Sequence, residues 1–358
     1  MASSFSRARA CGWSDSHGDC PCGCLPGTVP FLISMTIRKP SSAVPKQAGA
    51  ELPINIAIVG LGKIARDQHL PALAANGAFK LIAIASPHNK LDDLPSYKSL
   101  DSLLKAHAEL TAVSLCTTPQ VRYETALHAL QYGCHVLLEK PPGVTVSEVL
   151  ALIDVAREKK LTLFASWHSR HARAVEPARR WLAERKVMSA TVNWKEDVRV
   201  WHPGQKWIWR AGGLGVFDPG INALSILTRI IPSALALKEA ELSFPANCET
   251  PIAAQLALES TGGASVRVSL DFLQTGPQSW DIEIETDAGR LTLCMGGAMM
   301  FVDGKPVDIG PSEEYPNLYA HFANLVHQQH IDADVAPLQL VADAFLCGRR
   351  VEVAPFVE

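Results

Sequence analysis

The hydrophobic and polar positions divide the chain into a first half of short apolar runs and a second half of longer alternating ones. Ile54–Val59, which leads into Gly60, is the first short run, and amphipathic stretches separate it from the next. Such runs predict strands buried on both faces, with helices between them. The expected strands are 54–59, 80–85, 112–116, 135–138 and 161–165, and the expected helices are 63–75, 121–132 and 146–159. This alternation predicts an α/β Rossmann fold with a doubly wound parallel sheet.

After about Trp167 the pattern changes to longer strands with hairpin turns, such as Asp287-Ala-Gly and Asp303-Gly. The pattern predicts an α+β domain with a large, mostly antiparallel sheet. Pro316 and Pro337 are expected to open the last two helices, because proline suits a first helical position. The expected strands are 189–195, 236–243, 252–259, 265–272, 280–286 and 290–294, and the expected helices are 219–231, 316–328 and 337–349.

These patterns predict three parts: a disordered leader (1–50), a domain with the doubly wound parallel sheet (51–170) and an α+β domain (171–358). The leader is rich in Ser, Arg, Pro, Gly and Cys and has no helical or strand period. Its cysteines lack the paired C-x-x-C arms and histidines of a zinc site, so disorder or a true start at Met35 is favoured over a metal site. A faint similarity to a transit peptide stays open. These cysteines are Cys11, Cys20, Cys22 and Cys24.

Composition narrows the class of protein. Hydrophobic residues make up 47% of the 358 residues and charged residues 19%, which is typical of a globular chain with a real core. The net charge of -3 argues against a nucleic-acid partner. No apolar run is long enough to span a membrane. The five cysteines after the leader are interpreted as reduced thiols, which predicts a cytoplasmic protein.

The first predicted strand leads into Gly60-Leu-Gly62-Lys-Ile-Ala65, the G-x-G-x-x-A form of a dinucleotide-binding fingerprint. Gly60 permits a tight turn, Gly62 lets the backbone approach a pyrophosphate, and Ala65 allows close packing of helix on strand. Glycines also serve ordinary turns, but here the motif lies between a predicted strand and a predicted helix. We therefore expect a nicotinamide dinucleotide at this turn.

The second predicted strand ends at Ser86-Pro-His-Asn-Lys90, where an NAD-specific site usually has a carboxylate that binds the ribose. Ser86, His88 and Lys90 would not repel a 2′-phosphate. A plain polar loop would explain His88 and Lys90 individually. The missing carboxylate favours NADP or dual use of NADP and NAD.

Glu139-Lys140-Pro141-Pro142 follows a later strand of the same predicted sheet. Ligands of doubly wound sheets bind at the carboxyl ends of strands, so Lys140 is expected where nicotinamide and substrate meet. A lysine there can donate to a substrate oxygen or take part in proton transfer. Taken alone, Lys140 would be explained more simply as a surface lysine that ends a strand.

Together, the glycine motif and Glu139-Lys140-Pro141 resemble the Gfo/Idh/MocA oxidoreductase family over the chain from Ile54 to its end. Three longer segments resemble the bacterial aldose 1-dehydrogenases of that family, which act on L-arabinose and D-galactose. These segments are Gly62-Lys-Ile-Ala-Arg-Asp-Gln-His-Leu-Pro71, Trp194-Lys-Glu-Asp-Val-Arg199 with Trp201-His-Pro-Gly204, and Gly213-Leu-Gly-Val-Phe-Asp-Pro-Gly-Ile-Asn222. Many relatives in the wider family carry histidine where this chain has Asn222.

The resemblance implies roles for individual residues. Asp218 would be the base, Lys140 would orient the anomeric oxygen O1, and Asn222 would hold O1 or a ring hydroxyl. Asp218 and Asn222 are four residues apart and share a helix face, although an N-cap Asp and a surface Asn would fit too. The expected substrate contacts are Lys140, His168, Glu196, Trp201, His202, Asp218 and Asn222. The expected cofactor contacts are Gly60, Gly62, Lys63, Ile64, Ser86, His88, Cys116, Thr117, Thr118, Glu139 and Lys140.

The resemblance thus predicts oxidation of an aldose, D-galactose or L-arabinose, at C1 to the aldonolactone, with hydride transfer to NADP or NAD and no metal. It also implies that the Rossmann domain (51–170) binds the dinucleotide, and that the α+β domain (171–358) binds the substrate and mediates oligomerisation to a homodimer or homotetramer. Alternatives within the family are another sugar, polyol or dihydrodiol dehydrogenase. A sugar sensor that binds the cofactor without turnover is the alternative from another class, because fold does not dictate function.

Overall fold

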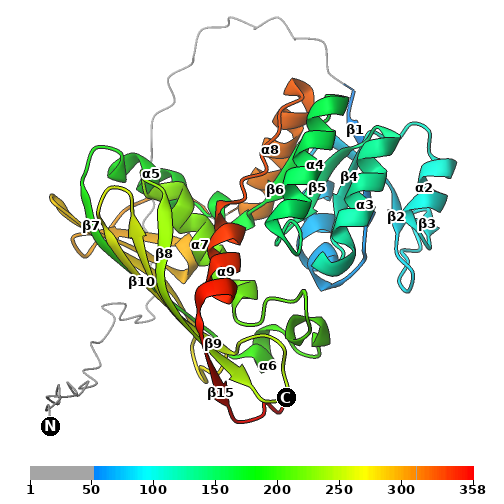
Figure 1. Ribbon diagram of the computed structural model, residues 1–358. Coiled ribbons are helices and arrows are strands. Elements are labelled where there is room, and N and C mark those ends of the chain that lie inside the picture. The colour runs from blue at the N-terminus through cyan, green and yellow to red at the C-terminus, as the bar shows by residue number, and fades with distance from the viewer. Residues whose placement is uncertain (1–51, 312) are drawn as a thin grey trace, which may run out of the picture. The chain divides into compact units, whose positions relative to one another are not determined.

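The computed structural model describes residues 52–311 and 313–358, and its first part is a parallel sheet of six strands in the order β3-β2-β1-β4-β5-β6 (Figure 1). The strands and intervening helices alternate along the chain, as expected for a doubly wound sheet. The strands are β1 (Ile54–Val59), β2 (Phe79–Ala85), β3 (Ser96–Tyr97), β4 (Ala112–Leu115), β5 (His135–Glu139) and β6 (Leu163–Ser166).

Both faces of this sheet are buried, because successive side chains of each strand point to opposite sides. On β1, Ala57 and Val59 pack into one core with α2 (Leu100–Ala106), α3 (Pro119–Tyr132) and α4 (Val146–Lys159). Ile56 and Ile58 pack into the opposite core with α1 (Leu70–Ala74) and α8 (Glu314–Gln328). The continuous apolar runs of the sequence follow from this burial on two sides.

The second sheet has nine strands in the order β14-β13-β12-β11-β7-β10-β9-β8-β15. Neighbours pair antiparallel except β10 with β7 and β15 with β8, which pair parallel. The strands are β7 (Val187–Lys195), β8 (Leu235–Pro245), β9 (Ala253–Ser260), β10 (Ser265–Asp271), β11 (Ser279–Thr286), β12 (Gly289–Cys294), β13 (Met299–Val302), β14 (Lys305–Pro306) and β15 (Arg349–Val353).

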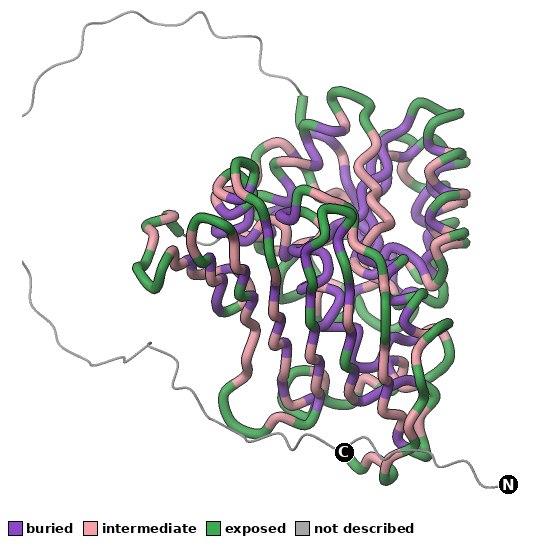
Figure 2. Tube along the Cα trace, turned by 60° about the vertical axis from the view of Figure 1, so that its left-hand side comes forward, coloured by how far each residue is buried: buried purple, intermediate pink, exposed green. Residues whose placement is uncertain are grey.

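One face of the second sheet is covered by α5 (Val175–Leu182), α7 (Phe217–Ile230) and α9 (Ala336–Cys347). Buried residues alternate with more exposed ones along its central strands, as the tube of Figure 2 shows. The strands therefore present one buried and one open face, which explains the alternating pattern of the sequence.

Helix α8, near the end of the chain, packs against the first sheet rather than the second. Phe322 of α8 stacks on Phe79 and Phe164, with ring centroids 5.7 and 6.0 Å apart. Tyr315 and Tyr319, one turn apart on the same helix, lie against His69. The first sheet is therefore completed by a segment that is distant from it in sequence.

The predicted fold class is confirmed: a parallel Rossmann sheet is followed by an α+β part with a large, mostly antiparallel sheet. The expected helix over 63–75 is observed as an unbroken helical segment from Lys63 to Ala74, in which a π-helical turn, η1 (Ala65–His69), precedes α1. Pro71 in the first turn of α1 has no amide N–H, so it cannot make the usual α-helical hydrogen bond.

Proline opens neither of the last two helices. Helix α8 begins at Glu314 and carries Pro316 in its first turn, and α9 begins at Ala336, one residue before Pro337. Proline is tolerated throughout the first turn, because those N–H groups have no partner within the helix. The expected extension of α9 to Arg349 is also wrong: α9 ends at Cys347, and Arg349 begins strand β15.

The sequence pattern gave no expectation for α2 or for the short strands β3, β13, β14 and β15, which are too brief for a clear period. The expected disordered leader, its cysteines and Met35 lie outside the described residues. Among the described residues, no helix is both long and apolar enough to cross a bilayer.

Candidate active site

The turn after β1 brings the carboxyl ends of β1 and β4 together at Gly60. This residue has φ +93°, a conformation that favours glycine, and its N–H donates to the carbonyl of Ala85 at 2.8 Å. A Cβ atom here would lie 2.8 Å from the amide nitrogen of Thr117 and 2.9 Å from the carbonyl carbon of Cys116. The first glycine of the motif is therefore required by close contact between the two loops.

A cleft of about 470 Å³ lies at these strand ends. Residues from both halves of the described chain line it, because the loop before α7 faces the ends of β1, β4 and β5. The expected cofactor and substrate contacts that line it are Gly62, Lys63, Ile64, Cys116, Thr117, Thr118, Glu139, Lys140, Trp201, His202 and Asp218.

Lys140 and Asp218 meet in this cleft. The Lys140 ammonium Nζ lies 3.1 Å from the carboxylate Oδ1 of Asp218 and donates to the Asp218 carbonyl oxygen at 2.9 Å. Both side chains are largely buried, at 14% and 4% exposed. Lys140 is thus not a free surface lysine but one partner of a buried ion pair at the end of β5.

The backbone on either side of Lys140 is held by two buried charged residues. Glu139 Oε2 accepts the Lys140 N–H at 2.7 Å. Arg122, in the first turn of α3, donates to the Glu139 carbonyl at 2.5 Å and also to the carbonyls of Pro141 and Thr117. Sequence reasoning missed Arg122, because an arginine in an amphipathic helix looks like a solvated surface residue.

A second chain of polar contacts leads from Asp218 towards the second sheet. His202 Nδ1 lies 3.7 Å from Asp218 Oδ2, and His202 Nε2 lies 3.0 Å from Glu196 Oε1. The indole N–H of Trp280 donates to Glu196 Oε2 at 2.8 Å. The exposed ring of Trp201 packs on Trp280 with centroids 4.8 Å apart, at the edge of the cleft. Imidazole, carboxylate and indole groups thus converge beside the Lys140–Asp218 pair.

Behind β5, a buried polar cluster surrounds Glu139 and His69. Tyr315 OH donates to Glu139 Oε1 at 2.7 Å, and His69 Nε2 lies 3.1 Å from the same oxygen. Although burial raises it, the hydrogen bond and charge of His69 lower the pKa of Glu139 to about 2. Burial lowers the pKa of His69, but Cys116, Tyr319 and Glu139 outweigh it and raise that pKa well above 6.5. Glu139 and His69 therefore form a buried ion pair.

His168, Glu196 and Asn222 are not among the residues that line the cleft, within the described part of the chain. His168 Nδ1 contacts Glu314 Oε2 at 2.8 Å, and its ring stacks on Tyr315. Glu196 lies behind His202, and Asn222 is half-buried one turn after Asp218 on α7. The helix thus places Asp218 and Asn222 at the expected spacing.

Ser86 and His88 also lie away from the cleft lining. Ser86 is buried at the end of β2, where its Oγ accepts the Asn89 N–H at 3.3 Å, and His88 is exposed. The Asn89 side-chain amide donates to the Leu61 carbonyl at 2.9 Å, which ties this loop to the glycine turn. Asn89 was not singled out from the sequence, since Asn in a polar loop carries no specific signal.

The residues present fit a dinucleotide. A Cβ at Gly62 would meet no atom within 4 Å, so the backbone of the second glycine faces open space. The Thr117 hydroxyl Oγ1 is buried without a hydrogen-bond partner. An open glycine turn with an unpaired hydroxyl opposite it suits a pyrophosphate with its many acceptor oxygens.

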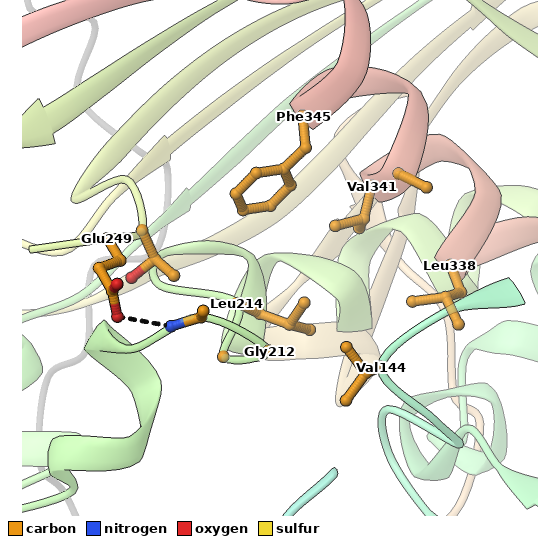
Figure 3. A pocket seen from close by; sticks show the side chains of 11 residues that line it. Val144, Gly212, Leu214, Glu249, Leu338, Val341 and Phe345 are labelled. Atoms are coloured by element: carbon orange, nitrogen blue, oxygen red, sulfur yellow. Dashed lines mark hydrogen bonds between the residues drawn. The ribbon is translucent and has the colours of Figure 1, made fainter. Parts of the chain in front are cut away.

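A separate cavity of about 260 Å³ lies between α9 and the loop before α7. Figure 3 shows apolar side chains around it, among them Val144, Leu338, Val341 and Phe345. Its one carboxylate, Glu249, accepts the backbone N–H of Ala211 at 2.8 Å. The cavity shares no lining residue with the cleft at Lys140.

The sequence of the chain is similar to those of known oxidoreductases. The sequence profile of the GFO_IDH_MocA oxidoreductase family, NAD-binding Rossmann fold, matches residues 54–166. Galactose 1-dehydrogenase from Pseudomonas fluorescens is 42% identical over 306 residues, covering 86% of this chain and 99% of that protein. D-glucoside 3-dehydrogenase from Escherichia coli is 28% identical over 135 residues, 36% of this chain and 38% of that protein.

Solved structures agree with the sequence comparisons. The crystal structure of D-galactose-1-dehydrogenase from Rhizobium etli is 51% identical, with a TM-score of 0.84, and covers 87% of this chain and 100% of that one. A 3-ketoreductase from Actinomadura kijaniata, solved with NADP, shares the fold with a TM-score of 0.73 at 19% identity, covering 84% and 99% of the two chains. The chain therefore belongs to the Gfo/Idh/MocA family of oxidoreductases with an NAD-binding Rossmann fold.

Proposed function

We propose that this oxidoreductase oxidises an aldose at C1 to the aldonolactone, with D-galactose and L-arabinose as substrates. The Lys140–Asp218 ion pair in the cleft is the observation that carries the proposal. The similarity to two galactose 1-dehydrogenases, over nearly their whole lengths, supports it. D-Galactose and L-arabinose share one ring configuration apart from an exocyclic carbon, so one pocket can accept both.

The reaction requires that C1 lose a hydride and O1 lose a proton. Asp218 accepts the O1 proton as the C1=O bond forms, and Lys140 donates a hydrogen bond to O1 and stabilises the negative charge that develops there. Gly60 and Gly62 would hold NAD(P)+ at the glycine turn, and the bound cofactor would supply the acceptor for the hydride and its electron pair. The sum is aldose plus NAD(P)+ giving aldonolactone, NAD(P)H and one proton.

The remaining polar groups would hold the sugar. His202 and Trp201 line the cleft next to Asp218, and Glu196 fixes the His202 ring from behind. An aromatic face with directional hydrogen-bonding groups suits a pyranose, which has apolar C–H patches and fixed hydroxyls. Asn222, one turn after Asp218, would contact O1 or a ring hydroxyl, and His168 would complete the pocket from the end of β6.

The cofactor preference proposed is NADP, with NAD also used. Ser86 and His88 stand at the end of β2, where an NAD-specific site carries a carboxylate. Gly60, Gly62, Lys63 and Ile64 would hold the pyrophosphate. Cys116, Thr117, Thr118 and Glu139 would line the path towards the nicotinamide.

The decisive experiment is a substrate panel monitored by nicotinamide absorbance with each cofactor. D-Galactose and L-arabinose should give the highest kcat/KM among aldoses, and inositols and dihydrodiols should give little or none. Turnover of a polyol or a dihydrodiol instead would assign the chain to another activity of the family. Tight cofactor binding with no turnover of any sugar would favour the sensor alternative.

We further propose a cytoplasmic homodimer or homotetramer. The second sheet of a single chain leaves one face open, as Figure 2 shows, and such a face suits self-association. Light scattering after gel filtration tests this, and a monomer at micromolar concentration would contradict it.

A further inference from the structure

His69 lies in the segment Gly62–Pro71, yet no step proposed so far uses it. Its side chain is 0% exposed and does not line the cleft. Burial of a histidine in such a place is costly unless both ring nitrogens have partners. The contacts of these two nitrogens therefore indicate what the residue is for.

One nitrogen contacts the residue that precedes the proposed catalytic lysine. His69 Nε2 lies 3.1 Å from Glu139 Oε1, and Tyr315 OH donates to the same oxygen at 2.7 Å. The other carboxylate oxygen, Oε2, accepts the backbone N–H of Lys140 at 2.7 Å. His69 and Tyr315 thus fix the orientation of the Glu139 carboxylate. This carboxylate in turn holds the backbone of Lys140 through the hydrogen bond from its N–H.

The other nitrogen anchors the imidazole to the rest of the sheet. His69 Nδ1 contacts Tyr319 OH at 2.7 Å and Ser114 Oγ at 3.2 Å. Tyr315 and Tyr319 belong to α8. Their rings pack edge-on against the His69 ring, with centroids 5.1 and 5.7 Å away. Because all these groups are buried, the ring has little freedom to rotate.

We propose that His69, held by Tyr315 and Tyr319, is a positioning residue that acts through Glu139 to fix Lys140 for reaction. The proposal rests on the proposed function, because it needs Lys140 to act on the substrate. The raised pKa of His69 agrees with it, since an imidazolium can donate from both nitrogens at once. A displacement of about 1 Å of a reacting group can slow a reaction by about a hundredfold, so the position of Lys140 matters.

The test is a double-mutant cycle with Lys140. His69→Gln removes the charge of the ring but keeps a donor group, and Tyr315→Phe removes only the hydroxyl that donates to Glu139. In the wild-type background we expect His69→Gln to lower kcat about tenfold and Tyr315→Phe about threefold, with the cofactor Kd changed less than about twofold. In the Lys140→Met background, both should lower kcat less than about twofold further, because the residue they position is gone.

His107→Gln is the matched control. His107 belongs to the same sheet domain and also contacts a tyrosine hydroxyl, Tyr97 OH, at 3.1 Å, but it is remote from Glu139. It should leave kcat unchanged in both backgrounds. Melting temperatures of all variants show whether a loss of kcat follows merely from a loss of folded protein.

The outcomes separate the two proposals. Equal fold losses in both backgrounds, or an unchanged kcat in His69→Gln and Tyr315→Phe, would overturn the positioning role while leaving the proposed function intact. An unchanged kcat in Lys140→Met alone would overturn the proposed chemistry, and the positioning role with it. If His69→Gln does not fold, Tyr315→Phe carries the same test, because it deletes a single oxygen atom.

Discussion

The Nζ atom of Lys140 contacts both a carboxylate oxygen and the carbonyl oxygen of Asp218, at 3.1 and 2.9 Å, across 78 residues of sequence. The lysine directly follows β5, and the aspartate lies in the first turn of α7, so each is placed by a different half of the described chain. A buried ion pair of this kind gives little net stability. Its position at the strand ends of a dinucleotide fold indicates chemistry instead.

The first prediction concerns this pair. Lys140→Met and Asp218→Asn should each lower kcat for D-galactose by about a hundredfold or more, the usual range for losing a positioned proton-transfer group. The cofactor Kd, measured by fluorescence, should change little, because the glycine turn that is proposed to hold the pyrophosphate is untouched. The double variant should be less impaired than the product of the two single losses, since the two groups act as one unit.

A near-normal kcat in Asp218→Asn would contradict its role as the base and transfer that role to Lys140 or to water. Asn222→Ala is the comparison on the same helix. It should raise KM and lower kcat together, as expected of a residue that holds the sugar without taking its proton.

The second prediction concerns cofactor choice. Ser86→Asp should weaken NADP+ binding at least about tenfold more than NAD+ binding, because a carboxylate would face the 2′-phosphate. Ser86→Asn, which has the same shape without the charge, is the matched control and should affect both cofactors alike. Quenching of the protein's tryptophan fluorescence during titration with NADP+ or NAD+ measures both dissociation constants. Equal effects of Ser86→Asp on the two cofactors would mean that Ser86 does not contact the ribose.

The third prediction concerns stability and pH. The pKa of His69 lies well above 6.5 in the folded protein, whereas in the unfolded chain it is close to its ordinary value. Protonated His69 therefore contributes its full stabilisation below about pH 6.5, and the contribution falls as pH rises towards the folded pKa. Urea unfolding measures the free energy of unfolding of wild type and of His69→Gln. The difference between these two free energies should be smaller at about pH 9 than at about pH 6.

The pKa of His171 is shifted in the opposite direction from that of His69, so its effect on stability should depend on pH in the opposite way. Burial and the neighbouring His321 lower the pKa of His171 to about 4. Its neutral ring is favoured by folding, so its contribution is present above about pH 6.5 and is lost as pH falls towards the folded pKa. The difference in the free energy of unfolding between wild type and His171→Gln should therefore become smaller as the pH falls.

For His69→Gln, a difference in the free energy of unfolding from wild type that is the same at every pH would contradict the buried ion pair of His69 and Glu139.

The fourth prediction concerns the guanidinium of Arg122, which holds three backbone carbonyls at the ends of β4 and β5. Burial lowers its pKa to about 10, so it stays charged at neutral pH. Arg122→Lys should lower the free energy of unfolding by about 2–3 kcal/mol, because one ammonium cannot reproduce the planar fork and leaves buried carbonyls without a donor. Urea unfolding measures this. Arg180→Lys, at an exposed position of α5, should change stability by less than about 0.5 kcal/mol.

The order of elements and the fingerprint at Gly60 were determined by the local sequence. A strand buried on two faces needs a continuous apolar run, and a strand with one open face needs alternation. Both signals lie within single strands such as Ile54–Val59 and Ser265–Asp271, so they need no knowledge of the fold. For the same reason the glycine at the end of β1 could be predicted from the turn that it must form.

Only the tertiary structure showed which buried groups hold the backbone of Lys140. His69, Tyr315 and Arg122 come from three segments whose local patterns predict only helices, and no period of the sequence indicates that they meet at β5. The packing of α8 against the first sheet could not be predicted from the sequence for a similar reason. The apolar stripe of the helix indicates that one of its faces is buried, but not which sheet covers that face. Burial pattern is a local property of the chain, whereas the partner of a buried group is set by packing between distant segments.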